Sequence, residues 1–76
     1  LLDVYTRLRA MLERRAQPRP EGTRLVPDRL THQAIASEIG CSREMVSRLL
    51  KDLEEGGYLA LVDRKLVLMR DLPARW

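Results

Sequence analysis

One predicted helix in this chain carries its polar and its apolar side chains in two separate stripes. The polar stripe has spacings of three and four residues, so its members share one helix face; they are Arg43, Glu44, Ser47, Arg48 and Lys51. A guanidinium group can donate two hydrogen bonds to guanine O6 and N7, and a carboxylate can accept one from the cytosine amino group. A helix with such a face fits the major groove of duplex DNA. The stripe therefore predicts that Arg43, Glu44 and Arg48 read base edges.

The same charges have a simpler interpretation as the solvated face of a surface helix. Glu44 and Arg48 are four residues apart, and such a pair stabilises a helix by about 0.2–0.5 kcal/mol. A carboxylate also weakens non-specific attraction to phosphate, so Glu44 favours DNA binding mainly if it specifies a base or orients an arginine. For the stripe taken alone, both interpretations stay open.

A helix-turn-helix is predicted to position this face. Thr31 is expected to cap a helix over residues 32–39, and Gly40 to end it. Ala36 is small enough for a second helix to cross closely at that point. The apolar side of the first helix is expected to contain Ala34, Ile35 and Ile39.

The second helix of the motif is expected to run over residues 43–54. Ser42 is its predicted cap, and Gly56-Gly57 follows its end. Its apolar stripe is expected to contain Met45, Val46, Leu49, Leu50 and Leu53. Ala36, Gly40, Val46 and Leu49 stand at the mutual spacing that a helix-turn-helix requires.

Phosphate contacts are expected at the edges of this motif. His32 and Ser42 lie at predicted helix N-termini, where backbone N–H groups favour an anion, and Gln33 can donate to a phosphate as well. Arg64 and Lys65, at the tip of a predicted hairpin, could reach the flanking backbone, and Lys51 lies on the polar stripe. The alternatives are pure capping by Ser42, a neutral surface His32, and a solvated charged turn.

The flanking segments predict one further helix and two hairpins. Asp3 is expected to cap a helix that ends near Ala16, with Val4, Leu8, Met11 and Leu12 on one face. Residues 17–22 are expected to form a loop, and residues 23–26 and 29–30 a small hairpin around Pro27-Asp28. Residues 58–62 and 66–69 predict a second hairpin around residues 63–65. Trp76 is expected either to cover the edge of the core or to be exposed.

Size and composition limit the classes of protein that fit. The chain has 76 residues, of which 45% are hydrophobic and 33% charged, which predicts one small folded domain. Cys41 is the single cysteine, so a reducing cytoplasm is expected. No apolar run approaches the roughly 20 residues that span a membrane. No membrane contact is therefore expected.

An enzyme is not expected either. His32 and Cys41, the one possible pair of nucleophile and base of this kind, would lie at opposite ends of a short helix, about 13 Å apart by the helical rise. The sequence contains no metal-ligand cluster and no phosphate-cradling glycine loop. Neither a metal nor a cofactor is therefore expected in this chain.

The positive charge is unevenly distributed. The net charge is +3, and residues 1–30 hold seven arginines against four acidic residues. Residues 31–53 balance three basic residues against three acidic ones, and residues 54–76 balance four against four. A polyanionic partner is permitted by the total charge but not required by it. Any DNA contact must depend on which face carries which charge.

Two segments carry a resemblance to a known family. They are Leu-Thr-His-Gln-Ala-Ile-Ala over residues 30–36, and Gly-Cys-Ser-Arg-Glu-Met-Val-Ser-Arg-Leu-Leu-Lys-Asp-Leu-Glu over residues 40–54. The chain resembles, over nearly its whole length, the C-terminal DNA-binding domain of the cyclic-AMP receptor protein / FNR family of bacterial transcription regulators. Two positions differ from the common pattern: Met45 stands where threonine is frequent, and Asp63 where glycine is frequent.

The resemblance implies a mainly α (α+β) winged helix-turn-helix fold, with a single DNA-binding domain over residues 1–76. The motif would span residues 32–55 and the wing residues 58–69. Arg43, Glu44, Ser47 and Arg48 would read bases in a TGTGA-like or a TTGAT-like half-site of double-stranded DNA. Phosphates would be bound by His32, Gln33, Ser42, Lys51, Arg64 and Lys65.

The resemblance also implies a longer regulator, with Leu1-Leu2 as the end of the connection to its effector barrel and dimerisation helix. Expectations for that full-length protein are a cyclic nucleotide or another small effector, a homodimer, and contact with RNA polymerase. The competing hypothesis is a winged helix that serves as a protein–protein interaction module. Such a module usually carries apolar or like-charged groups on its third helix, unlike the mixed stripe found here.

Overall fold

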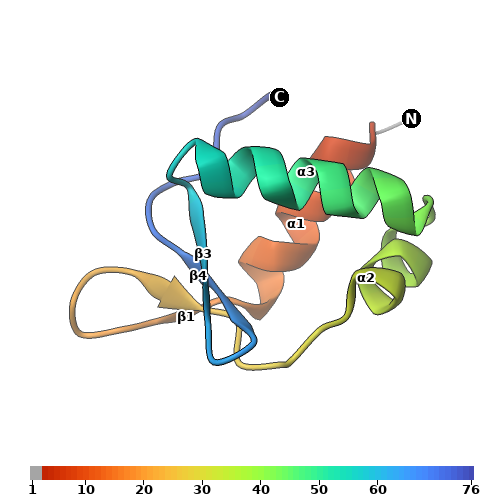
Figure 1. The fold of residues 1–76 in the computed structure, drawn as a ribbon. Helices are drawn as coiled ribbons and strands as arrows, with labels where there is room; N and C mark the ends of the chain where they lie inside the picture. The colour runs from red at the N-terminus through yellow and green to blue at the C-terminus, as the bar shows by residue number, and fades with distance from the viewer. Residues whose placement is uncertain (1–2) are drawn as a thin grey trace.

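The described part of the chain forms three helices and a four-stranded antiparallel sheet (Figure 1). The computed structural model describes residues 3–76, so the connection assigned to Leu1-Leu2 lies outside the described residues. The elements are α1 (Val4–Arg15), β1 (Gln17–Pro18), β2 (Arg24–Leu25), α2 (His32–Ile39), α3 (Arg43–Glu55), β3 (Leu59–Val62) and β4 (Lys65–Leu68). The strands pair in the order β1-β2-β4-β3. The predicted fold class, α+β with a hairpin before and after the helix pair, is confirmed.

Each helix begins at a side chain that caps it. Asp3, Thr31 and Ser42 accept hydrogen bonds from backbone N–H groups three residues further on, at 2.7, 3.0 and 3.1 Å. The bond from Thr6 N–H holds the pKa of Asp3 below its ordinary value. Gly40 ends α2 with a φ of 77°, a left-handed conformation that other residues adopt at a cost. The predicted caps and the predicted turn are confirmed.

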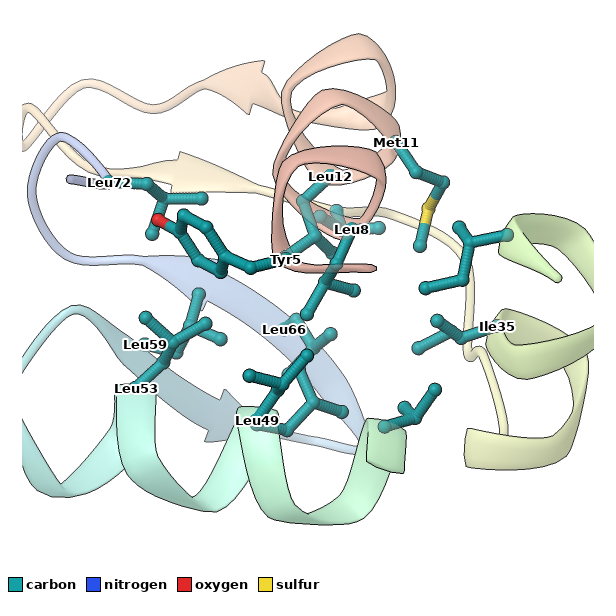
Figure 2. Close-up of a cluster of buried hydrophobic side chains, with 14 of the residues drawn as sticks. Tyr5, Leu8, Met11, Leu12, Ile35, Leu49, Leu53, Leu59, Leu66 and Leu72 are labelled. Carbon is teal, nitrogen blue, oxygen red and sulfur yellow. The ribbon is translucent and has the colours of Figure 1, made fainter. Parts of the chain in front are cut away.

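The core lies where α1, α3, α2 and the sheet converge (Figure 2). Leu8, Met11 and Leu12 of α1 are fully buried, and Met11 points toward α2, where Ile35 lies. Leu49 and Leu53 of α3 point into the same core. The contributions from the other elements are Ile35, Ala36 and Ile39 of α2, and Leu59, Leu66, Val67 and Leu68 of the sheet. The predicted apolar face of α1 is therefore correct for Leu8, Met11 and Leu12.

The end of the chain closes this core at one side. Leu72 is buried, and the hydroxyl of Tyr5 donates a 2.6 Å hydrogen bond to the carbonyl oxygen of Pro73. Trp76 packs its indole edge to face against Tyr58, with ring centroids 5.7 Å apart, and also contacts the Tyr5 ring. Of the two expectations for Trp76, covering the edge of the core is the correct one, although half of its surface stays exposed.

Two side chains predicted to lie on apolar faces point to solvent instead. Ala34 is exposed, and Met45 is 38% exposed. With about 100° between successive residues, Met45 lies roughly 90° from the centre of the buried stripe of α3. Ala34 lies roughly 150° from the centre of the buried face of α2, almost opposite it. The predictions for these two residues were wrong because they followed the apolar side-chain type rather than the angular position of each residue around its helix.

The small hairpin before α2 lies upstream of its predicted position. β1 pairs with β2 through Gln17↔Leu25 and Pro18↔Arg24, so the predicted loop over residues 17–22 contains a strand. The chain reverses direction between these strands, where Gly22 adopts a φ of 96°. The predicted turn at Pro27-Asp28 instead lies in the loop that leads to α2.

This difference has a long-range cause. β2 also pairs with β4, through Arg24↔Leu68 and Leu25↔Val67, so its position is set by a strand more than forty residues away in sequence. β1 is one of the two outer strands of the sheet, where proline is tolerated because one side of the strand needs no ladder hydrogen bond. Local turn signals contain none of this information.

The C-terminal hairpin closes with a two-residue turn. Val62 pairs with Lys65, so Lys65 begins β4 and only Asp63 and Arg64 form the turn. Both turn residues have positive φ, 53° and 65°, as a type I′ turn requires. The predicted hairpin is present, but its turn is one residue shorter than predicted.

The conformation of Arg64 generates a stability prediction. Glycine at this position would give the Asp-Gly sequence that type I′ turns favour. We expect Arg64→Gly to raise the free energy of unfolding by about 0.5–1 kcal/mol, because relief of the positive φ exceeds the added entropy of the unfolded chain. Urea denaturation measures the change. Arg64→Ala is the matched control, since it removes the guanidinium but keeps the strain, and a similar gain in this control would contradict the prediction.

Candidate nucleic-acid interface

The helix α3 has one buried face and one exposed face. Val46, Leu49, Leu50 and Leu53 are buried, and Figure 2 shows Leu49 and Leu53 pointing from α3 into the core. The predicted site residues Arg43, Glu44, Arg48 and Lys51 are all exposed. Packing thus fixes the helix through one face and leaves the opposite face accessible to a large partner.

The charged groups at the start of α3 pair with each other. The Arg43 guanidinium lies 3.6 Å from the Glu44 carboxylate, and both side chains remain largely exposed, at 55% and 78%. Glu44 thus pairs with its neighbour in sequence rather than with Arg48. An exposed pair of this kind contributes little to stability, so it leaves both groups available to bind a partner.

Ser47 and His32 are brought together by the crossing of α2 and α3. The Nδ1 atom of His32 lies 2.7 Å from Ser47 Oγ, within hydrogen-bonding distance. His32 is the first residue of α2 and is exposed, whereas Ser47 is half-buried in the middle of α3. A residue predicted to read bases and one predicted to bind phosphate therefore form one unit, which the sequence did not indicate.

The remaining predicted phosphate-binding residues lie at three places on the surface. Gln33 is exposed on α2 and donates a 3.4 Å hydrogen bond to Ser37 Oγ. Ser42 is exposed and caps α3. Arg64 is exposed in the wing turn, whereas Lys65 is half-buried at the start of β4. These residues thus lie at the start of α2, at the N-terminus of α3 and on the wing.

The turn of the wing is in contact with a residue that the sequence did not indicate. Arg29, in the loop before α2, lies 3.3 Å from the Asp63 carboxylate. The two residues are 34 positions apart, and no spacing rule connects them. Asp63, at a position where glycine is frequent, thus places a carboxylate in contact with the loop before α2, although both side chains are exposed and the pair adds little stability.

A cluster of arginines fixes α2 against α1. Arg7 Nε donates a 2.7 Å hydrogen bond to the carbonyl oxygen of Ile39, at the last turn of α2. Arg15 contacts Glu38 at 2.6 Å and Asp28 at 2.9 Å, and these carboxylates raise the pKa of Arg15. The helix-turn-helix is thereby held on a charged scaffold as well as on an apolar core.

The packing of α2 on α3, the short turn at Gly40 and the hairpin after α3 define the class of protein: a winged helix-turn-helix domain. Within it, residues 29–59 match the family model described as "Bacterial regulatory proteins, crp family". The chain belongs to this family.

Three curated relatives agree with this assignment. The chain is 39% identical over 72 residues to the cAMP-activated global transcriptional regulator Vfr of Pseudomonas aeruginosa, covering 88% of this chain and 32% of that protein. It is 39% identical over 72 residues to the CRP-like protein Clp of Xanthomonas campestris pv. campestris, covering 88% and 30%. It is 43% identical over 51 residues to the global nitrogen regulator of Synechocystis, covering 67% and 22%. The chain thus spans about a third or less of these relatives.

Among residues 3–76, no helix has the length and apolar character needed to cross a bilayer.

The capping contact of Ser42 can be tested by stability alone. Ser42→Ala removes the hydrogen bond accepted from Met45 N–H, and we expect the free energy of unfolding to fall by about 1 kcal/mol. Ser42→Asp is the matched control, because aspartate caps a helix as well as serine does and should keep the stability of the parent. Denaturant titration of all three proteins measures the effect. Equal stability of Ser42→Ala and the parent would show that the cap is not needed.

Proposed function

We propose that this domain binds duplex DNA sequence-specifically, as the DNA-binding part of a bacterial transcription regulator, with α3 in the major groove. The supporting observation is that one face of α3 is buried in the core while Arg43, Glu44 and Arg48 stand exposed on the other. A major groove admits a helix with such a face. The names of two relatives, the transcriptional regulator Vfr and the global nitrogen regulator, support the proposal.

In this proposal the outer face of α3 reads the sequence. Arg43 and Arg48 donate in pairs to guanine, and each good bidentate contact discriminates against a wrong base by roughly 1–3 kcal/mol. Glu44 accepts from a cytosine amino group, or holds Arg43 in a reading position through their contact at 3.6 Å. Ser47 adds a hydroxyl, which can donate or accept. The proposed half-site is TGTGA-like or TTGAT-like.

Residues around this face contact the sugar–phosphate backbone in the proposed complex. The N-termini of α2 and α3 offer His32, Gln33 and Ser42 together with free backbone N–H groups. Lys51 lies further along α3, and Arg64 and Lys65 on the wing. Such contacts fix the register on the duplex without carrying sequence information.

The larger assembly follows from the same geometry. Each copy touches one half-site, so two copies related by a two-fold axis would place their reading helices about 34–36 Å apart on a palindrome. A homodimer in the cytoplasm is therefore part of the proposal, as are contact with RNA polymerase and control by a cyclic nucleotide or another small effector bound outside this chain. The name of Vfr, a cAMP-activated regulator, supports the cyclic nucleotide.

Loss of a base-reading arginine should differ from loss of a phosphate-binding one. We expect Arg48→Ala to relax the preference for one base pair by about tenfold, because it removes a bidentate contact. Arg64→Ala should weaken binding to all sequences alike. Competition binding of the 76-residue chain to duplexes with single base-pair changes measures both effects. An equal loss on every sequence for Arg48→Ala would contradict the base-reading role.

Salt dependence distinguishes DNA binding from use as a protein-interaction module. Three cations are assigned to phosphates, namely Lys51, Arg64 and Lys65. We expect the logarithm of the affinity for DNA to fall with the logarithm of the salt concentration at a slope of about −3. In Arg64→Ala the slope should become shallower by about one. Fluorescence anisotropy over a salt series measures these slopes, and an affinity for DNA that is independent of salt would contradict the proposal.

A further inference from the structure

We infer that His32 sets the direction in which Ser47 presents its hydroxyl group, and that the base contacted by Ser47 therefore carries an amino group in the major groove. Adenine and cytosine are such bases. The inference deepens the proposed function and rests on it. It makes His32 a positioning residue for base reading, in addition to a phosphate contact.

The contact between the two side chains is the starting observation. His32 Nδ1 and Ser47 Oγ are 2.7 Å apart, a short distance for a hydrogen bond between a nitrogen and a hydroxyl. The two residues come from different helices, with His32 at the start of α2 and Ser47 at the fifth position of α3. Because Arg7 and Glu38 hold α2 on α1, the imidazole is attached to a fixed element beside the reading helix.

The hydrogen-bonding partner of His32 Nε2 decides whether Nδ1 donates to Ser47 or accepts from it. A neutral imidazole has one N–H donor and one acceptor nitrogen, and the partner of one nitrogen decides which is which. In the proposed complex His32 lies at a helix N-terminus next to the DNA backbone, so Nε2–H donates to a phosphate oxygen. Nδ1 is then the acceptor, and the Ser47 hydroxyl must donate its single hydrogen to it.

A serine hydroxyl that has donated its hydrogen can only accept from the groove. The major-groove donors are adenine N6 and cytosine N4, whereas thymine O4 and guanine O6 are acceptors. Each Watson–Crick pair contains one base of each kind. Ser47 should therefore distinguish a base pair from the same pair in reversed orientation, A·T from T·A or C·G from G·C. Reversal places the carbonyl oxygen of thymine or guanine against the lone pairs of the Ser47 hydroxyl, and two acceptors repel.

The first step of the experiment locates the pair that Ser47 reads. Half-site duplexes carrying each base pair in both orientations compete for the 76-residue chain at low salt and about pH 8. For the parent we expect one position at which the amino base is preferred by about fivefold, the equivalent of one neutral hydrogen bond. Ser47→Ala should abolish the preference at that position only.

The second step tests the role of His32 at the same position. His32→Ala should reduce the orientation preference to less than twofold, because the hydroxyl is then free to donate or to accept. The double variant His32→Ala with Ser47→Ala should show no larger loss of orientation preference than Ser47→Ala alone, as expected for two residues that act as one unit. His32→Asp supplies an acceptor-only group near the position of Nδ1. It should therefore restore the preference for the amino base while weakening binding to every duplex.

Each failure has a separate meaning. A parent chain without any sequence preference would overturn the proposed function and the inference with it. If the parent reads sequence, the inference alone is overturned by an unchanged preference in His32→Ala, by a preference for the carbonyl-bearing base, or by a lack of rescue in His32→Asp. Thermal melting of each variant without DNA confirms that it is folded, and the ratio between two orientations of one pair is insensitive to a general loss of affinity.

Discussion

Burial of a single aliphatic stripe on α3 is the interaction on which the whole domain depends. A helix of 13 residues is marginal in water by itself, so α3 persists because Val46, Leu49, Leu50 and Leu53 pack into the core. Removal of one such side chain typically costs about 2–5 kcal/mol, which is a large part of the stability of a small domain. Since this stripe supplies the buried contacts of the helix, Arg43, Glu44 and Arg48 on its exposed face carry no packing role. These three residues are therefore available to contact a partner.

Most of the positively charged side chains in the first 30 residues contact groups of the protein itself rather than lying free at the proposed interface. All seven arginines of residues 1–30 contact a carboxylate or a backbone carbonyl: Arg7, Arg9, Arg14, Arg15, Arg19, Arg24 and Arg29. Within the described part of the chain, by contrast, Arg48, Lys51 and Arg64 have no carboxylate within ion-pair distance. A few cations without an ion-pair partner, close to a helix face that fits the DNA groove, would guide DNA binding more than the total charge does. The reason is that salt screens charges more than about 10 Å apart. The net charge of +3 is therefore a poor guide to the site.

The sequence predicted those features that are encoded by neighbouring residues. Caps at Thr31 and Ser42, the glycine at position 40 and the buried stripe of α3 each depend on spacings within about one or two helical turns. Features that depend on distant segments were missed. β2 lies where β4 can pair with it, and Arg29 meets Asp63 only once the sheet has formed. Of the candidate site, the exposed face of α3 was predictable from periodicity, whereas the contact between His32 and Ser47 required the crossing of two helices.

These long-range contacts connect the parts of the proposed interface to one another. α2 is anchored to α1 by the hydrogen bond from Arg7 to Ile39, and the wing is anchored to the loop before α2 by Arg29 and Asp63. β4, which is buried along most of its length, connects the wing to β2 and hence to the first hairpin. A reading helix that could tilt within the domain would make its base contacts only part of the time, and discrimination would fall accordingly. In the proposed complex, sequence preference would therefore depend on the whole scaffold, because the scaffold positions the hydrogen-bonding groups of α2, α3 and the wing relative to one another.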